Sequence, residues 1–121
     1  MKISVLIIED SKYAADLNVR QLRKAGFDVS YKVVSSRDEM EEAIHDQSWD
    51  IIISDNSMPG FSALQALEMR NKLGEGIPFV IVSEQVSPEE ISQGMNNNCT
   101  AFVAKEKLIQ LREVITDILC K

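Results

Sequence analysis

Residues 51–60, with the sequence IIISDNSMPG, decide which fold this chain adopts. Three consecutive isoleucines show no alternation with polar residues, which is typical of a strand buried on both faces in a parallel sheet. Asp55 follows, and open parallel sheets bind their ligands at the carboxyl ends of the strands. The stretch predicts a central strand that presents one carboxylate, although Asp55 and Asn56 could simply cap the turn that follows.

Further strands lie on both sides of this stretch, and each is followed by a helical pattern. An apolar strand is predicted at residues 3–8, a buried strand at 78–83 and a brief strand at 101–104. An alternating strand typical of a sheet edge is predicted at residues 29–34. The first helical pattern stops at Gly26, which suits the left-handed residue after a helix. A last amphipathic helix is predicted from Lys107 to the carboxyl terminus.

Serine residues mark the starts of the first four helices. They are Ser11, Ser36, Ser62 and Ser87. Side chains suited to a capping box follow the last three of them at Glu39, Gln65 and Glu90. In the first helix the predicted apolar stripe runs through Ala14, Leu17, Gln21 or Leu22, and Ala25. In the third helix we expect Leu64, Leu67 and Leu73 to face inward.

Five β-α units without repeats or linkers predict a doubly wound α/β fold, with a five-stranded parallel sheet and helices on both faces. If the strand order is 2-1-3-4-5, as in flavodoxin-like folds, a crevice opens above the carboxyl ends of strands one and three. Glu9, Asp10 and Asp55 would meet there.

Composition narrows the function classes. A chain of 121 residues is the size of one domain, so residues 1–121 are expected to fold together. The net charge of -6, with scattered Lys and Arg, disfavours nucleic-acid binding.

No apolar run is long enough to span a membrane, and the amino terminus lacks the cleavage site of a signal peptide, so a cytoplasmic protein is expected. Cys99 and Cys120 are expected to be small buried hydrophobic residues, and His45 a surface residue.

Three carboxylates in one crevice repel one another and need a compensating cation. Oxygen ligands favour Mg²⁺, which typically keeps part of its octahedron free for phosphate oxygens. Ser83 and Lys105, at the ends of strands four and five, would bring a hydroxyl and a cation to the same edge. Both suit a phosphoryl group, and an aspartate can act as the nucleophile toward a phosphoryl donor.

These motifs together resemble the receiver domain of two-component response regulators over the whole chain. The resemblance rests on Glu9-Asp10, on Asp55 followed by the Met-Pro-Gly turn, on Ser83 and on Lys105. It implies a regulatory domain with self-catalysed phosphorylation rather than an enzyme with a separate substrate. Asp55 would be the phosphate acceptor, and Mg²⁺ would be held by Glu9, Asp10, Asp55 and the backbone carbonyl of Ser57.

The resemblance also implies a switch and its partners. Ser83 would move to bind the phosphoryl group, Phe102 would follow it, and Lys105 would pair with the phosphorylated site. The phosphoryl donor would be a histidine kinase or a phosphotransfer protein. A downstream partner, or a second copy forming a homodimer, would bind the surface of helix four, strand five and helix five.

Two departures from the family keep alternatives open. Glu106 follows Lys105 where receivers carry a proline, so we expect a trans peptide bond there, and Phe102 has no tyrosine hydroxyl. A degenerate receiver acting as a phosphorylation-independent interaction module is one alternative, in which Ser83 is only a strand-end hydroxyl and Lys105 a solvated lysine. A small flavodoxin-like or phosphohydrolase enzyme is another, but Glu9-Asp10 puts negative charge where a flavin phosphate would bind.

Overall fold

Strands and helices alternate in the computed structural model, which describes residues 1–56, 58, 60–74, 76–84 and 87–120. The strands are β1 (Lys2–Ile8), β2 (Asp28–Val34), β3 (Ile51–Asp55), β4 (Phe79–Ser83) and β5 (Ala101–Ala104). The helices are α1 (Lys12–Lys24), α2 (Arg37–Asp46), α3 (Ala63–Leu73), α4 (Pro88–Asn96) and α5 (Gln110–Leu119). A short 3-10 turn, η1 (Lys105–Lys107), joins β5 to α5.

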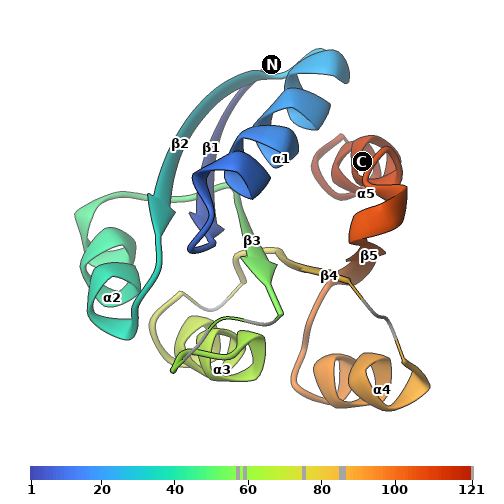
Figure 1. Ribbon diagram of the computed structural model, residues 1–121. Coiled ribbons are helices and arrows are strands. Elements are labelled where there is room, and N and C mark those ends of the chain that lie inside the picture. The colour runs from blue at the N-terminus through green and yellow to red at the C-terminus, as the bar shows by residue number, and fades with distance from the viewer. Residues whose placement is uncertain (57, 59, 75, 85–86, 121) are drawn as a thin grey trace.

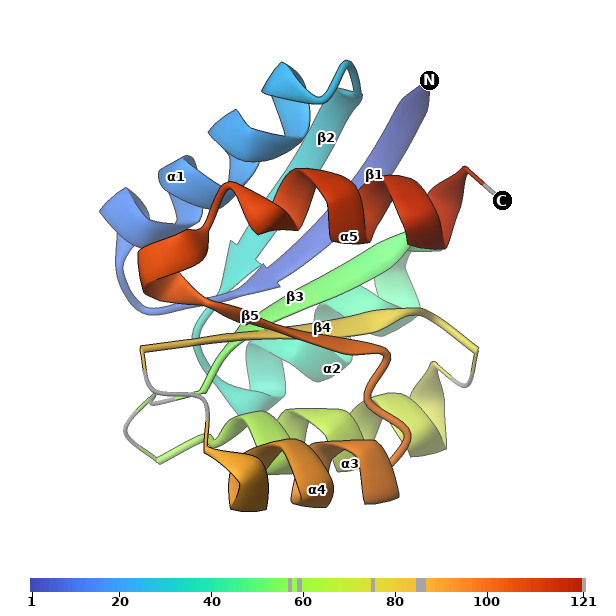
Figure 2. The ribbon, with the colours of Figure 1, turned by 90° about the vertical axis from the view of Figure 1, so that its right-hand side faces the viewer.

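All five strands pair in parallel, in the order β2-β1-β3-β4-β5. Helices α1 and α5 cover one face of the sheet, and α2, α3 and α4 cover the other (Figures 1 and 2). The predicted doubly wound fold, its strand order and the edge position of β2 are therefore confirmed. Among the described residues no helix combines the length and apolar character needed to cross a bilayer.

The isoleucine run of β3 serves both cores of the molecule. Ile51 and Ile53 pack in the core beneath α1 and α5, whereas Ile52 packs in the core beneath α2 and α3. All three side chains have an exposed fraction of 0%. Burial of each isoleucine stabilises the fold by about 1.5–3 kcal/mol, so β3 is held firmly in the centre of the sheet.

The predicted helix starts are confirmed by hydrogen bonds at the caps. The hydroxyl oxygens of Ser11, Ser36, Ser62 and Ser87 each accept from a backbone N–H in the first turn of the helix that follows. Helix α3 has the complete capping box expected from Ser62 and Gln65. Gly26 adopts the left-handed conformation, with φ of 100°, as predicted for the end of α1.

Three predictions about helix faces and lengths were wrong in whole or in part. In α1 the core residues are Ala15, Val19 and Leu22, so Leu22 of the predicted stripe is confirmed, whereas Ala14 and Leu17 are only partly buried. Leu73, expected to face inward, is 39% exposed because it ends α3, beyond the turn that packs on the sheet. Helix α5 begins at Gln110 rather than Lys107, since η1 occupies the residues in between.

The cysteine prediction holds for one residue only. Cys99, between α4 and β5, is buried, but Cys120 is exposed because it follows the end of α5. His45, on α2, is exposed as predicted.

Arg70 of α3 is a buried cation that the sequence did not single out. Its guanidinium donates to the backbone carbonyls of Ile77, at 2.5 Å, and Asn98, and lies over the ring of Phe79. Burial lowers the pKa of this side chain. Because Asn98 follows α4 and Ile77 precedes β4, Arg70 ties the carboxyl-terminal end of α4 to α3.

Phe102 of β5 packs closely on the last turn of α4. A Cβ atom added at Gly94 would lie 2.5 Å from the Cε2 and Cζ atoms of the Phe102 ring, closer than carbon atoms can approach. Gly94 thus lets the helix approach the aromatic ring. The half-buried ring of Phe102 in turn packs against the core beneath α2 and α3.

Gly94→Ala should reverse the sign of its effect on stability when the Phe102 ring is removed. With the ring present, overpacking costs about 1–3 kcal/mol, which outweighs the gain of about 1 kcal/mol in helix propensity. In the Phe102→Ala background only the helix gain remains, so the same substitution should stabilise. Urea unfolding of the four proteins measures both effects, and Gln93→Ala on the exposed side of α4 is the control. A stabilising Gly94→Ala in the presence of Phe102 would show that the two residues do not constrain each other.

Candidate functional site

Acidic side chains from two strands converge at the carboxyl edge of the sheet. Glu9 and Asp10 directly follow β1, and Asp55 is the last residue of β3. Each can offer a carboxylate oxygen such that all three oxygens lie within 4.8 Å of one another. The backbone N–H of Glu9 donates to the carbonyl of Val34 at 2.9 Å, which extends the ladder between β1 and β2. Glu9 is only 4% exposed, whereas Asp10 is exposed.

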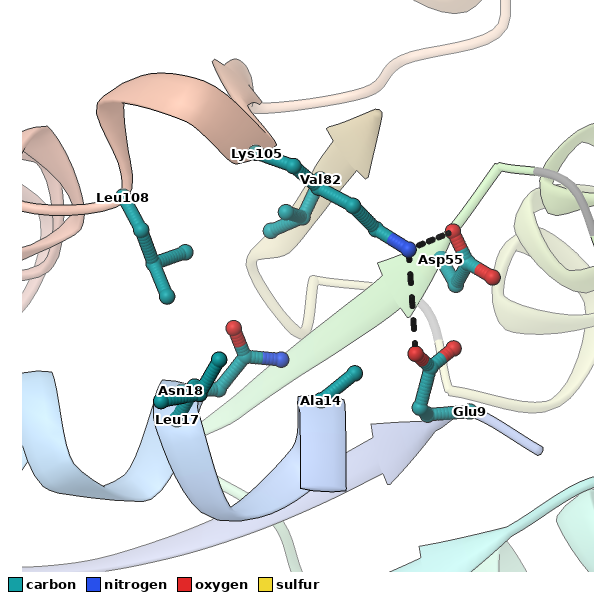
Figure 3. Close-up of a pocket in the computed structure, with 8 residues that line it drawn as sticks. All are labelled: Glu9, Ala14, Leu17, Asn18, Asp55, Val82, Lys105 and Leu108. Carbon is teal, nitrogen blue, oxygen red and sulfur yellow. Dashed lines mark ion pairs between the residues drawn. The ribbon is translucent and has the colours of Figure 1, made fainter. Parts of the chain in front are cut away.

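Lys105 brings a cation to these acids from the far side of the crevice. Its Nζ lies 3.0 Å from Oδ1 of Asp55 and 3.8 Å from Oε1 of Glu9 (Figure 3). Burial alone would lower the pKa of Lys105, but the hydrogen bond and charge of Asp55, with the charges of Glu9 and Glu84, outweigh it and raise the pKa. The ammonium therefore stays charged and partly neutralises the acids.

Glu106, the residue that departs from the family pattern, is exposed and leaves these contacts intact. Within the described residues, both ion pairs of Lys105 are with Asp55 and Glu9. The peptide bond that joins Lys105 to Glu106 is trans, as expected without proline.

Glu9 is held in an environment that disfavours its charge. Its carboxyl pKa is raised from 4.5 to about 8. Burial is the largest cause, and a hydrogen bond with Asp55 and the charges of Asp55 and Asp10 act in the same direction, against the opposing charge of Lys105. Its Oε2 atom is buried and has no hydrogen-bond partner. Without a further cation, the Glu9 carboxyl holds its proton to a higher pH than an ordinary glutamate does.

The donor set fits a hard divalent cation such as Mg²⁺. All three groups are carboxylates, which Mg²⁺ prefers, and the unpartnered Oε2 of Glu9 is an oxygen whose burial is costly unless a donor or a cation meets it. The backbone carbonyl of Ser57, expected as a further ligand, lies outside the described residues, as does Pro59 of the turn.

Ser83 and Phe102 lie on the opposite side of Asp55 from β1. Ser83 is the last residue of β4 and is 2% exposed, and its Oγ accepts a hydrogen bond from Nδ2 of Asn56 at 3.4 Å. Phe102 pairs with Ile81 in the neighbouring strand, and its ring faces Gly94 of α4. Sequence reasoning treated Asn56 only as a turn residue and gave its partner Glu90 only a capping role.

A cavity of about 70 Å³ opens beside the acids, between α1 and the η1 turn (Figure 3). Asn18, which is 7% exposed, contributes a polar side chain to a wall that is otherwise mostly apolar. The remaining lining residues are Glu9, Ala14, Leu17, Asp55, Val82, Lys105 and Leu108. A volume of this size accommodates a few water molecules rather than an organic ligand.

A family model described as the response regulator receiver domain matches residues 5–116. The chain belongs to this family. The match confirms the family predicted from the sequence. Receiver domains are regulatory domains of two-component signalling rather than classical enzymes.

Two curated relatives match this chain over a small part of their own length. The sensory/regulatory protein RpfC of Xanthomonas campestris pv. campestris is 29% identical over 119 residues, which cover 94% of this chain and 16% of that protein. A gliding motility regulatory protein of Myxococcus xanthus is 26% identical over 110 residues, covering 88% of this chain and 14% of the relative. The chain thus spans less than one fifth of the length of these two relatives.

Solved structures agree with the receiver fold. A DNA-binding response regulator of the LuxR family from Staphylococcus aureus matches with a TM-score of 0.81 and 25% identity over 96% of this chain and 98% of the other. The receiver domain of a sensor histidine kinase from Pseudomonas aeruginosa, with a magnesium ion coordinated in its active site cleft, matches with a TM-score of 0.79 and 18% identity over the whole of both chains.

The raised pKa of Glu9 predicts that the metal-free receiver loses stability as the pH rises. The folded state keeps a proton up to about pH 8 that the unfolded chain releases near 4.5, so the stability that this proton supplies is complete below pH 4.5 and disappears as the pH passes 8. One such proton changes the free energy of unfolding by at most ~1.4 kcal/mol per pH unit.

Urea unfolding in the presence of a chelator, from pH 5 to pH 8, measures this loss. Glu9→Gln should flatten the decline, because the amide cannot titrate, whereas the exposed control Glu41→Gln should keep it. Equal slopes in wild type and Glu9→Gln would mean that the Glu9 carboxyl is ionised in the folded state.

Proposed function

We propose that this receiver domain accepts a phosphoryl group on Asp55 from the phosphohistidine of a histidine kinase or a phosphotransfer protein. The reaction depends on Mg²⁺ bound by Glu9, Asp10 and Asp55, with the Ser57 carbonyl as a further ligand. In this proposal residues 1–121 act as a single receiver domain in the cytoplasm.

The observation that carries the proposal is the position of Asp55 between a lysine ammonium and two further acidic side chains. Its carboxylate meets the Lys105 ammonium at 3.0 Å on one side and the carboxylates of Glu9 and Asp10 within 4.8 Å on the other. A structural acid would need only the lysine. The additional acids, one of them buried with an unpartnered oxygen, favour a site that recruits a cation and a phosphoryl group.

The chemistry follows from these positions. A carboxylate oxygen of Asp55 attacks the phosphorus of the donor, a P–O bond forms as the P–N bond to the histidine breaks, and the bonding electron pair remains on the imidazole nitrogen. Lys105 neutralises charge on the phosphoryl oxygens and the Ser83 hydroxyl donates to one of them. Bound Mg²⁺ supplies positive charge that offsets the phosphoryl oxygens and the acids.

The output surface in this proposal is formed by α4, β5 and α5. Ile91 and Met95 on α4 are 38% and 51% exposed, and Ile109 before α5 is 60% exposed. Movement of Ser83 toward the phosphoryl group would release Phe102 from its packing on Gly94 and reshape this surface. A downstream partner, or a second copy forming a homodimer, would bind there.

Treatment with a small phosphodonor and Mg²⁺ should add one phosphoryl mass to the wild-type protein, located on Asp55. Asp55→Asn should abolish the addition because the amide is a poor nucleophile. Lys105→Ala should still be phosphorylated, but the NMR shift changes that phosphorylation causes in α4 and α5 should shrink. Intact-protein mass spectrometry and NMR spectra provide the two measurements.

The alternative of a phosphorylation-independent interaction module makes the opposite prediction. It would be favoured if the wild type gained no phosphoryl mass while remaining folded and binding Mg²⁺. A mass gain that persists in Asp55→Asn would place the acceptor elsewhere in the chain.

A further inference from the structure

Asn56 connects three segments of the chain through a single amide group. Its Nδ2 atom donates to Oγ of Ser83 at 3.4 Å and to Oε2 of Glu90 at 3.1 Å. Asn56 directly follows the proposed acceptor Asp55, Ser83 ends β4, and Glu90 lies in the first turn of α4. The backbone of Asn56 is also fixed, since its N–H donates to the carbonyl of Val82 at 3.3 Å.

We propose that Asn56 is a positioning residue for phosphoryl transfer, which orients the Ser83 hydroxyl while Glu90 of α4 holds the amide in place. The inference rests on the proposed function and deepens it. It gives α4 a part in the chemistry at Asp55, in addition to its place in the output surface.

The first step of the argument concerns the Ser83 hydroxyl. A hydroxyl can rotate, and it has one proton to donate and two lone pairs that accept. The Asn56 amide donates to one of the two lone pairs, so this contact does not use the hydroxyl proton. A hydroxyl that accepts one hydrogen bond is polarised toward donating another, which is the role that a phosphoryl oxygen requires.

The second step concerns the orientation of the amide. The contact with Ser83 is long at 3.4 Å, whereas that with Glu90 is 3.1 Å and has a carboxylate as its acceptor. Hydrogen bonds to ionised acceptors are roughly twice as strong as neutral ones, so Glu90 fixes the direction in which Asn56 points. Glu90 is itself anchored, because its backbone N–H donates to the Ser87 Oγ at 3.1 Å.

The test compares rates of phosphoryl incorporation from a small phosphodonor with Mg²⁺, followed by intact mass. Asn56→Ala should slow incorporation about fivefold, the factor that corresponds to one neutral hydrogen bond. Glu90→Ala should give part of the same loss, whereas Glu90→Gln, which keeps an acceptor oxygen, should restore most of the rate. Glu89→Ala is the matched control, since it removes the same charge from the same helical turn at an exposed position.

If Asn56 acts through its contacts with Ser83 and Glu90, substitutions at these residues should have non-additive effects on the rate of phosphoryl incorporation. Asn56→Ala should change the rate no further in a Ser83→Ala background, and Asn56→Ala with Glu90→Ala should match Asn56→Ala alone. Urea unfolding of each variant separates these effects from a loss of folding.

Wild-type rates in Asn56→Ala, additive losses with Ser83→Ala, or an equal loss in Glu89→Ala and Glu90→Ala would each overturn the inference. The proposed function itself would be unaffected by those results. An absence of phosphoryl incorporation in the wild type would overturn both.

Discussion

Crowding of Glu9, Asp10 and Asp55 at one edge of the sheet is the constraint on which the rest of the site depends. Burial of Glu9 disfavours its charge, and repulsion between carboxylates this close adds to the cost, which is why the pKa of Glu9 rises to about 8. The acids cannot move apart because β1 and β3 are fixed by fully buried side chains such as Ile7 and Ile53. Apolar packing thus stabilises an electrostatic arrangement that is unfavourable by itself.

Lys105 compensates for only part of this charge. Its position at the site depends on where β5 ends. The strand stops at Ala104, and the η1 turn then directs the lysine side chain toward Asp55 and Glu9. The neighbouring Glu106 stays at the surface, where an exposed ion pair is worth no more than about 1 kcal/mol. The departure from the family pattern after Lys105 therefore leaves the lysine at the site.

Much of the fold could be predicted because its signals are local. An unbroken run such as Ile51–53 can be satisfied only by burial on both faces, and a serine before a helical pattern identifies the first turn. Two of the errors fell at helix ends. Neither the exposure of Leu73 nor the late start of α5 has a local signal, since both depend on how far a helix extends over the sheet.

The acids could also be anticipated, because topology brings strand ends together whatever the details of packing. The contacts of Asn56 and Arg70 could not be anticipated from the sequence. Asn56 and Glu90 lie 34 residues apart and look like a turn residue and a helix cap, and Arg70 looks like an exposed helical cation until α4 covers it. Polar contacts between distant segments become visible only when the segments have been placed in space.

Titration of metal-free protein with Mg²⁺ at pH 7, without any phosphodonor, tests the central claim most directly. If the three acids form one site that needs a cation, NMR shift changes should concentrate at Glu9, Asp10 and Asp55, and Asp10→Ala should weaken binding at least about tenfold. Asp16→Ala, an exposed acid on α1, should bind as wild type does. Equal affinity in wild type and Asp10→Ala would contradict the account, because the acids would then not share a cation.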